Sequence, residues 1–582
     1  MKLPAFRGSK CRGRGTHTAI LLLFAGAVVN SVSNVAEAAG PAVTLAAFGP
    51  RVLITGMTGT NWYGDTWDGA WSSNGVLYLQ HNDGVGFGSG GPFEHDRICR
   101  VEGSPQVVSS LSGTNLNLGV LGNSLSNSPC YSTGLYEVDG VLYHNICYSV
   151  QKPGAYVFEN TSTIKSTDGG VNWINDLGQT NTIPTNDVSV SMFPNTNWGE
   201  VNFVKYGAGG VAPNVDNAQA YVYLCSGTAG YRLARVARAD LPKLDKTKIK
   251  YYTGGDGIVD SNWTSEITNS VVFTTNKSSA TAMTYNEGLG RYIMTSFSGD
   301  SFATPPVEST LRVMEAPHPW GPWTLLLDEN VNNEESDNLA WAFLMPKFTS
   351  PDGSKMWMSV AGRAPYGLQF VPVHLTTQPV QMQEAENSAI TGGVVATNIP
   401  GYSGSGYVSG LSAIGDKCEF AFDVATAGQY IFQARYNTSA YRNLGFYVNG
   451  KSRGQLLLGT SEQTYATWTD ISLVTWLQSG TNLIALQCDD DVGSANLDKV
   501  TLALYTTNVV SGLEARPIGG GLNGITMDFD TLPGVAYALE WESNLTAATW
   551  QPLTNFTGSG ATVQVDFTNG LRQGFCRIKI IP

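Results

Sequence analysis

The sequence has little charge, few histidines and few cysteines. Only 14% of the 582 residues are charged, six are His and eight are Cys. The cysteines are too sparse for a disulfide scaffold, and the lack of a C-x-x-C pair or a tight His/Cys cluster argues against a structural zinc site. A G-x-S-x-G nucleophile elbow and a phosphate-cradling loop are also missing. The chain contains instead 66 Gly, 14 Trp and 25 Tyr, a composition typical of all-β extracellular proteins.

Residues 1–38 are predicted to be a signal peptide. Basic residues near the start precede an apolar stretch, Ala19 to Val29, that is too short to span a bilayer. Ala36 and Ala38 form an A-x-A site, so we expect cleavage after Ala38, with an uncleaved anchor as the alternative. No later apolar run could span a membrane. We therefore expect a monomeric protein that is secreted or held at the cell surface, without a membrane span.

The chain without this segment is strongly acidic. Removing residues 1–38 takes away five basic residues and one acid, so the formal net charge changes from −13 to −17. Nucleic-acid binding depends on neutralising phosphates with basic residues, so we expect no nucleic-acid partner. A neutral or cationic polysaccharide or oligosaccharide fits this charge better. Trp and Tyr rings suit the flat C–H patches of sugars, although most of these rings are expected to be ordinary strand residues.

Seven cysteines remain after residue 38. Cys130 with Cys147, and Cys418 with Cys488, are candidate disulfides. Buried free thiols are an equally open alternative, because free cysteine behaves as a small apolar side chain.

Residues 45–377 are predicted to form a five-bladed β-propeller. Short strands alternate with turns rich in Gly, Asn, Asp and Ser, and helical periodicity is almost absent. In five units a candidate inner strand is followed by a turn and a second strand, as in propeller blades. A pair of β-sandwiches is the alternative, but it does not explain this repeated order. The candidate inner strands are GAWSS (69–73), STGLYEV (132–138), VNFVKYG (201–207), ATAMTYN (280–286) and AFLMPKF (342–348).

One candidate blade carries an Asp-box pattern, S-x-D-x-G-x-x-W, in STDGGVNW (166–173). Asp168 is expected to accept hydrogen bonds from turn amides, Gly170 to supply an unusual backbone angle and Trp173 to pack between sheets. The motif recurs in sialidases and many other propellers. It therefore predicts a structural turn rather than a catalytic site.

Two smaller all-β units are predicted after the propeller. The strand order breaks at Thr377 to Pro379, and residues 380–506 then alternate apolar and polar side chains, as in a β-sandwich or jelly roll. A linker rich in small residues follows. Residues 512–582 are predicted to form a small Ig-like β-sandwich.

The middle unit resembles the carbohydrate-binding modules of families six and thirty-five. EAEN (384–387), GYSGSGYV (401–408), AGQYIFQARY, YVNG and ANLDKVTL carry the resemblance, in this order. It implies a structural calcium ion held by Glu384, Glu386 and Asp498, and hard oxygen ligands suit this ion. Surface carboxylates without a metal are the alternative.

The same resemblance implies sugar binding through loop aromatics and an amide. Asn496, before LDKV, matches a ligand position of the family, whereas Trp468 could equally belong to the core. The candidates are Tyr441, Asn443, Trp468 and Asn496.

The first unit resembles a family of exported bacterial five-bladed propellers of unknown function. The matching pieces run in order through the unit and include GDTWDGAWSSNGVLYLQHNDGVGFG, YRLARVARADL, YNEGLGRYIMTSF and PKFTSPDGSKMWM. Some propellers of this type are glycoside hydrolases, including arabinan-cleaving ones, so the resemblance implies glycan hydrolysis. One departure is Asn74, in a turn where an acidic residue is expected nearby. The last unit is similar to small β-domains that end secreted proteins of polymer-degrading bacteria, with a surface role and an accessory role both open.

Propeller topology predicts that several acids share one end of the first unit. The inner strand of each blade starts at the mouth of the central funnel, and the loop after the second strand returns to that mouth. This rule places Asp65, Asp83 and Glu200 at the mouth, with Asp300 and Asp337 as further members.

Such a group suits glycoside hydrolysis, in which one carboxylate activates water or attacks the sugar and a protonated one donates to the leaving oxygen. We assign Asp65 as base, Glu200 as acid and Asp83 as the group that orients the site or tunes its pKa. Asp139, in a tight turn at the opposite end, is expected to be structural. The side chains expected to hold the substrate in this unit are Trp62, Trp67, Arg97, Trp198 and Asp337.

Other interpretations remain open. Asp before a strand often caps a turn, and grouped carboxylates could bind a cation. A polysaccharide lyase would use His81 or His144 with Tyr148, but the basic clamps that anionic glycans require are lacking. The competing class is a non-catalytic glycan-binding or adhesion protein in which the propeller only binds.

Overall fold

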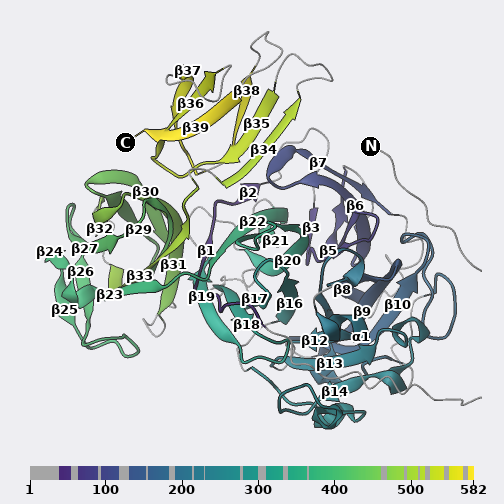
Figure 1. The fold of residues 1–582 in the computed structure, drawn as a ribbon. Coiled ribbons are helices and arrows are strands. Elements are labelled where there is room, and N and C mark those ends of the chain that lie inside the picture. Colours follow the sequence, from purple (N-terminus) through teal and green to yellow (C-terminus); the bar gives the residue numbers. More distant parts are fainter. Residues whose placement is uncertain are drawn as a thin grey trace, which may run out of the picture. The chain divides into compact units, whose positions relative to one another are not determined.

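A computed structural model of the chain is nearly all β (Figure 1). Its described part contains antiparallel strands, short 3-10 helices and one five-residue α-helix, α1 (Asp216–Ala220), and none of its helices is long and apolar enough to cross a membrane. The described residues run from 39 to 581, except for 54–62, 89–92, 117–129, 153–154, 183–190, 213–214, 228–229, 275–278, 299–309, 332–338, 364–365, 460–467, 491–494, 509–510, 518–524, 543–549, 561 and 568–574.

The first part of the chain forms sheets that each contain one of the predicted strand–turn–strand units. The first sheet contains β4 (Gly69–Trp71), β5 (Leu77–Gly86), β6 (Arg97–Ser104) and β7 (Val107–Asn115), with β3 (Tyr63–Asp65) paired to β5. The second contains β8 (Cys130–Val138), β9 (Val141–Lys152) and β10 (Ala155–Ser166). The third contains β11 (Val201–Lys205), β12 (Tyr221–Ser226), β13 (Arg232–Ala237), β14 (Lys250–Tyr252) and β15 (Trp263–Thr264).

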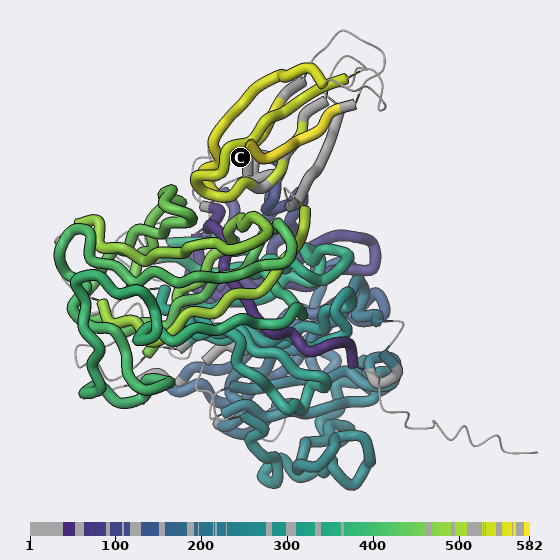
Figure 2. The backbone as a smooth tube through the Cα atoms, turned by 60° about the vertical axis from the view of Figure 1, so that its left-hand side comes forward, coloured from purple at the N-terminus to yellow at the C-terminus, as the bar shows by residue number. Residues whose placement is uncertain are grey.

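Two further groups of strands complete this part. One contains β16 (Ser279–Asn286), β17 (Arg291–Ser298), β18 (Thr310–Ala316) and β19 (Thr324–Asn330). The other contains β20 (Ala340–Thr349), β21 (Lys355–Arg363) and β22 (Tyr366–Thr376), to which β1 (Leu45–Phe48) and β2 (Val52–Leu53) add from the beginning of the chain. Figure 2 shows this early segment, in purple, running among the teal strands.

The inner strands contact one another in a closed order: β4, β8, β11, β16, β20 and again β4. β11 and β16 even form a short parallel ladder, with Val204 opposite Met283 and Lys205 opposite Thr284. Sheets that meet radially along their first strands are the arrangement of a β-propeller. The all-β prediction is therefore confirmed, and it is this arrangement that places the mouth residues described below.

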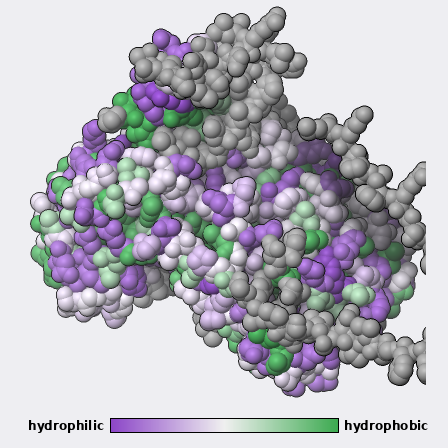
Figure 3. Space-filling view, viewed as in Figure 1, coloured by the Kyte–Doolittle hydropathy of each residue, from purple (hydrophilic) through white to green (hydrophobic). Residues whose placement is uncertain are grey.

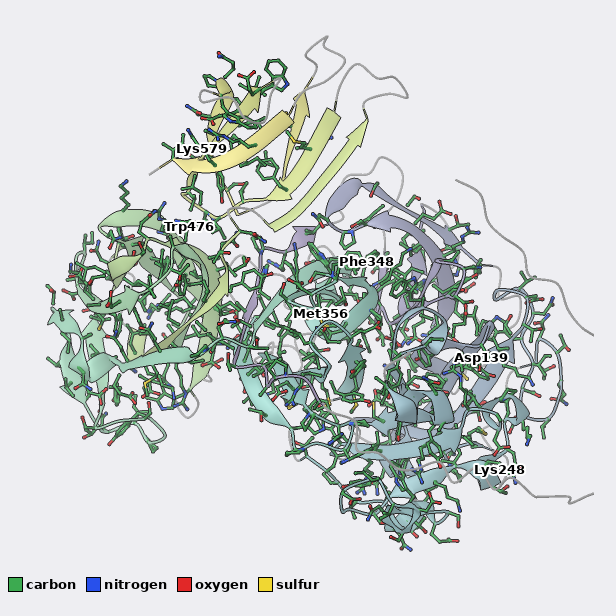
Figure 4. The ribbon with its side chains drawn as sticks, viewed as in Figure 1. Asp139, Lys248, Phe348, Met356, Trp476 and Lys579 are labelled. Carbon is green, nitrogen blue, oxygen red and sulfur yellow. The ribbon has the colours of Figure 1, made fainter. Side chains whose placement is uncertain are left out.

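Neighbouring sheets pack through apolar faces. All five residues of β11 are buried, because other sheets cover both of its faces. Tyr223, Phe203 and Tyr292 are among the largest fully buried side chains, and Met356, labelled in Figure 4, is fully buried too. Burying one such side chain stabilises the fold by about 1.5–3 kcal/mol.

The Asp-box residues form the predicted structural turn. Ser166 Oγ donates to Asp168 Oδ1 over 2.8 Å, and the amide and side chain of Asn172 also donate to this carboxylate, which lowers the pKa of Asp168 to about 2. Gly170 adopts a φ of +88°, which a side chain would disfavour. Trp173 is buried and donates its indole N–H to Gly170 O over 3.1 Å.

The second part of the chain contains two sheets that share one apolar core. In β27 (Lys417–Val424) every second side chain is buried, as the alternation in the sequence predicts. Figure 3 shows hydrophilic and hydrophobic residues interspersed in small patches on the visible surface. One sheet contains β31 (Thr469–Leu477), β28 (Gly428–Asn437), β33 (Ala495–Thr506), β26 (Tyr407–Leu411), β25 (Val394–Ala396) and β23 (Val380–Glu384). The other contains β24 (Ala389–Thr391), β27, β32 (Gly480–Gln487), β29 (Arg442–Val448) and β30 (Lys451–Leu458).

The last part of the chain also contains two sheets. One comprises β34 (Ser511–Pro517), β35 (Ile525–Asp530) and β38 (Thr562–Phe567). The other comprises β37 (Gln551–Thr557), β36 (Ala536–Glu542) and β39 (Phe575–Ile581).

The cysteines of the described residues are all free. The candidate disulfides Cys130–Cys147 and Cys418–Cys488 are therefore wrong, and the alternative of buried thiols holds. Cys130 lies opposite Tyr148 in the β8–β9 pair rather than opposite Cys147. Burial raises the pKa of Cys130 to about 12, so this thiol is not reactive at neutral pH.

Candidate active site at one end of the inner strands

Asp65 and Glu200 lie at the same end of the inner strands, as a chain of contacts shows. Asp65 ends β3 and lies opposite Asn82 of β5. The Asn82 amide donates to Ser132 O over 3.0 Å and accepts from Ser132 N over 2.9 Å, which fixes it to the start of β8. Thr133, the next residue, donates its hydroxyl to Val201 O over 2.9 Å. Val201 follows Glu200 directly and begins β11.

The Asp65 carboxyl is held between two hydroxyl donors. Thr66 Oγ1 donates to Oδ1 over 2.8 Å, and the phenol of Tyr366, at the start of β22, donates to Oδ2 over 2.5 Å. Asp65 is only 7% exposed. Burial, followed by the nearby charge of Asp83, raises its pKa to about 7 against the opposing effect of the two hydroxyl hydrogen bonds.

Asp83 lies beside Asp65 and has its own partner. His95 Nδ1 is 2.5 Å from Asp83 Oδ1. Burial raises the pKa of Asp83, and the bond to His95 works against this rise. The two aspartates therefore share one environment in which a second negative charge is disfavoured.

Glu200 is held in a tightly packed segment. Thr161 Oγ1 donates to the carbonyls of Trp198 and Gly199 over 3.1 and 2.8 Å. A side chain at Gly199 would place its Cβ 2.2 Å from Phe158 O, so only glycine fits there. Glu200 itself is half-buried, and burial raises its pKa to about 7.

The backbone is irregular at this end of the strands. Thr66 and Asp83 have φ angles of +52° and +47°, which non-glycine residues rarely adopt and β-branched ones least of all. Register shifts interrupt the pairing of β8, β16 and β20. Local strain and bulges concentrate at functional sites, where they aim particular side chains. Here Thr66, which donates to the Asp65 carboxyl, and Asp83, whose charge raises its pKa, are the two strained residues.

A buried ion pair crosses the inner strands next to this site. Lys205 of β11 contacts Asp68, just before β4, and donates to Gly69 O over 2.7 Å. Asp68 Oδ2 also accepts from the amide of Leu135 over 3.1 Å. Lys205 and Asp68 are completely or almost completely buried, and burial lowers the pKa of Lys205. This pair ties the first, second and third sheets together.

Two predicted sugar-binding tryptophans belong to the core instead. Trp67 is fully buried, packs against His81 at 4.7 Å and donates its indole N–H to Gly64 O over 2.9 Å. Trp198 is fully buried and stacks on Phe193 at 5.5 Å. Because neither ring is accessible, the prediction that they stack on sugar is wrong.

The other predicted substrate-binding groups of the propeller fall into two sets. Arg97 is buried and forms a two-point ion pair with Glu94, at 2.9 and 2.7 Å, so its guanidinium is largely engaged. Trp62, Asp300 and Asp337 lie outside the described residues.

The residues proposed for a lyase are not accessible. His81, His144 and Tyr148 are all fully buried. Burial lowers the pKa of His81 to about 4, and His144 Nε2 lies 3.0 Å from Asp96 Oδ2 inside the fold. A lyase base must touch the substrate, so these three residues do not support that alternative.

The aromatic residues around the acids were not among the predicted site residues. Tyr366 follows the second strand of the last propeller sheet, so the same topological rule would have placed it at the mouth. Tyr63, which is exposed, meets Tyr366 edge to face at 4.7 Å. His95 carried no signal, because its contact with Asp83 depends on the path of the loop before β6.

The predicted calcium ligands of the second part of the chain lie around one glycine. A Cβ on Gly404 would come within 3.0 Å or less of both Glu384 and Glu386. Ser403 bridges Glu384 and Asp498, since its hydroxyl lies 2.7 Å from Glu384 Oε2 and its amide 2.7 Å from Asp498 Oδ1. Glu386 Oε2 is buried and makes no hydrogen bond to a described residue, which fits an oxygen that would ligate a cation.

Two observations go against a ready-made metal centre there. Arg435 forms an ion pair with Asp498 over 2.7 Å. Among the residues that the structure describes, no group of three or more His, Cys, Asp or Glu side chains is arranged to hold a metal ion. The donor set therefore suits calcium in chemistry, while one of its three carboxylates has a protein cation as partner.

Two of the four predicted sugar-binding residues of this part lie at the same end of β28. Thr469, the residue after Trp468, lies opposite Tyr436, and Asn496 lies opposite Asn437, the next residue of β28. Trp468 meets Tyr407 at 5.2 Å and donates to Pro400 O over 2.9 Å. Asn496 is buried and lies 3.3 Å from the Asn437 amide. Tyr441 and Asn443 are half-buried at the start of β29.

Comparison with known proteins assigns the second part of the chain. Residues 381–505 match the model of the family 35 carbohydrate-binding modules, and they form such a module. A cycloisomaltooligosaccharide glucanotransferase of Niallia circulans is 32% identical over 151 residues, which are 25% of this chain and 15% of that protein. An exo-beta-D-glucosaminidase of Amycolatopsis orientalis is 32% identical over 167 residues, 27% of this chain and 16% of that protein. The chain thus spans less than a fifth of these curated relatives.

Two solved structures are similar to parts of the chain. A family 35 module from Clostridium thermocellum has 25% identity and a TM-score of 0.21, covering 21% of this chain and 97% of that one. An exo-beta-1,3-galactanase from Phanerochaete chrysosporium has 11% identity and a TM-score of 0.34, covering 80% of this chain and 99% of that one.

Proposed function

We propose that the protein hydrolyses glycosidic bonds of a polysaccharide in its propeller and binds the same material through its family 35 module. The observation that carries this proposal is the pair Asp65 and Glu200, which lie at one end of the inner strands with pKa values raised to about 7. Glycoside hydrolysis requires one ionised and one protonated carboxyl at the same pH. The five sheets are proposed as the five blades that bring these acids together.

The surroundings of the two acids suggest which one is the base. Hydrogen bonds from Tyr366 and Thr66 favour the charged form of Asp65. Burial is the cause that raises the pKa of Glu200. We assign the shared proton to Glu200, which donates it to the leaving oxygen. Asp65 activates water or attacks the sugar, and Asp83, beside it, raises its pKa and orients it.

The test is sugar release by single variants of the full chain. Asp65→Asn and Glu200→Gln are each expected to lower the release of reducing ends about 10²–10⁴-fold, the usual contribution of a general acid or base. The substrates are a panel of soluble plant and algal polysaccharides. Glu102→Gln is the matched control, because this carboxyl also lies in the propeller but is 65% exposed and pairs with Arg100.

The outcomes separate the hydrolase from a non-catalytic binder. The assignment is supported if the wild type and the control release sugar and both variants do not. Unchanged release by Asp65→Asn and Glu200→Gln contradicts it. Binding to the panel without release from any member would favour a glycan-capture or adhesion protein.

We also propose that the module holds a calcium ion through Glu384, Glu386 and Asp498. The unpartnered buried oxygen of Glu386 supports this, and bound calcium would supply structural cross-linking by hard oxygen ligands. Chelation with EDTA should then lower the unfolding midpoint of the module and added calcium should restore it; an ion at 100 times its Kd stabilises by about 2.7 kcal/mol. Glu386→Gln should remove most of this response, and an identical melt with and without EDTA would contradict the site.

Two features of the sequence complete the proposal. Residues 1–38 would direct export and be removed, so that the protein acts outside the cell as a monomer. Residues 45–377, 380–506 and 512–582 would be the propeller, the module and a terminal sandwich. Mass spectrometry of the exported protein tests the first point, since its mature chain should begin at Ala39.

A further inference from the structure

An aromatic arc connects the surroundings of Asp83 with those of Glu200. The arc consists of Phe93, His95, Tyr131 and Phe158. Successive ring centroids are 5.7, 5.5 and 5.8 Å apart, and the interplanar angles of 87°, 63° and 87° make every contact edge to face. Such contacts hold rings in fixed orientations, so the arc is a preformed surface.

Both ends of the arc are fixed next to a mouth acid. His95 contacts Asp83 at 2.5 Å. At the other end, Gly199 packs directly on the backbone of Phe158, and Glu200 follows Gly199. The arc therefore runs along the mouth from His95, the neighbour of Asp83, to Phe158, which lies beside the segment that carries Glu200.

The arc is accessible, unlike most aromatics of the propeller. Phe93 is 48% exposed and the His95 side chain 39%, while Tyr131 and Phe158 are half-buried. Single exposed apolar residues are common on protein surfaces. Four contiguous rings beside two carboxyls with raised pKa values are a different feature, because they join an apolar surface to groups suited to acid–base chemistry.

The charges around the arc indicate what it can bind. Asp65, Asp83 and Glu200 are acidic, and the neighbouring Arg97 is paired with Glu94. A uronic acid would bring a further negative charge close to these three acids, which disfavours its binding. A neutral sugar has no such penalty, and its C–H face can lie against aromatic rings.

We propose that the arc of Phe93, His95, Tyr131 and Phe158 is a subsite that binds an uncharged sugar residue of the chain to be cleaved. This inference rests on the proposed function, because it places the subsite between Asp83 and Glu200 of the proposed catalytic site. It selects neutral glycans over polyuronates. Phe93 and Tyr131 contribute contact surface, and His95 holds Asp83 in position.

The test measures binding separately from cleavage. In the full chain carrying Glu200→Gln, calorimetry follows binding of neutral oligosaccharides of glucose, galactose, xylose or arabinose, with oligogalacturonate as the charged counterpart. Phe93→Ala and Tyr131→Ala, added singly, should each weaken neutral-sugar binding at one class of sites about 3- to 10-fold. Binding by the family 35 module, the other class, should stay unchanged. Tyr131→Phe should retain the affinity, and Leu177→Ala, an exposed apolar residue of the same propeller, is the matched control.

The wild-type background supplies the second measurement. There Phe93→Ala and Tyr131→Ala should raise KM by the same factor and leave the pH dependence of kcat unaltered. Unchanged binding and KM in both variants overturn the subsite even if Glu200→Gln abolishes cleavage. Tighter binding of oligogalacturonate than of every neutral sugar overturns the charge selection. If Phe93→Ala and Tyr131→Ala weaken neutral-sugar binding but the wild type cleaves no substrate, the subsite stands and only the hydrolase proposal is contradicted.

Discussion

The pKa values of carboxyl groups are shifted in opposite directions at the two ends of the propeller's inner strands. At the mouth, the buried Asp65 and the half-buried Glu200 both have pKa values that loss of contact with water raises to about 7. At the other end Asp139, labelled in Figure 4, lies in the β8–β9 turn and forms two hydrogen bonds of 2.8 Å with Arg238, which lower its pKa. One end thus stabilises its ionised carboxylate, whereas the other disfavours it.

The two ends also differ in where the backbone adopts positive φ angles. The turn from Ser72 to Gly75 at the far end is closed by regular hydrogen bonds, with glycine at the position of positive φ. Asp139, also at the far end, has a φ of +54°, but it lies with Gly140 in a two-residue hairpin turn, where such angles are usual. At the mouth, Asp83 adopts such an angle inside β5 and Thr66 directly after β3, where no hairpin turn requires it. Strain of this kind at the mouth supports the proposed site.

The largest effect on stability is expected at the ion pair between the first and third sheets. Lys205→Met would leave Asp68 buried without its cation, which should lower the free energy of unfolding by about 3–5 kcal/mol. Urea unfolding measures this. The double variant Lys205→Met/Asp68→Leu is the control and should recover most of the loss, because it removes the uncompensated charge. Equal losses in both variants would show that packing, rather than charge, dominates there.

A smaller effect on the free energy of unfolding, of opposite sign, is expected at the mouth. The pKa of Glu200 rises from 4.5 to about 7 on folding, so the folded state binds more protons than the unfolded state between these values, and stability falls as pH rises through this window. Glu200→Gln should remove this fall. The stability of the variant relative to the wild type should therefore be about 1–3 kcal/mol higher at pH 8 than at pH 4. Denaturant melts at graded pH measure it, and a parallel pH dependence of wild type and variant would contradict the raised pKa.

The smallest effect is expected at the far end. The side chain of Asp139 is 64% exposed, and exposed ion pairs contribute about 1 kcal/mol or less. Asp139→Asn should therefore lower stability by at most this amount, through loss of the Arg238 ion pair, and should leave sugar release unchanged. A loss of activity in this folded variant would break the distinction between the two ends.

Much of the fold could be predicted because each propeller sheet contains a local strand–turn–strand pattern in the sequence. VLYHNIC after the turn VDG combines strand-forming residues with a turn that needs positive φ, and it forms β9 with Asp139 and Gly140 in the turn. The free cysteines could not be predicted. Cys130 and Cys147 lie on paired strands, and only the register shows that they are not opposite each other.

The grouping of the candidate acids could be predicted from the sequence, and the errors among the other candidate site residues have a common cause. Asp65, Asp83 and Glu200 follow from strand order, which the sequence carries. Trp67 and Trp198 were expected at the surface, yet both are core residues, because burial depends on how neighbouring sheets pack. The sequence does not encode this packing in any local pattern.

The pH dependence of sugar release by the wild type tests the central claim most directly. Asp65 must be ionised and Glu200 protonated, and both pKa values are raised to about 7. The rate should therefore follow a bell with its maximum near pH 7, falling on the acid side as the base is protonated and on the alkaline side as the acid is lost. A rate that stays constant from pH 5 to 9 (about 2 units on each side of these pKa values), or the same profile in Glu200→Gln, would contradict the account.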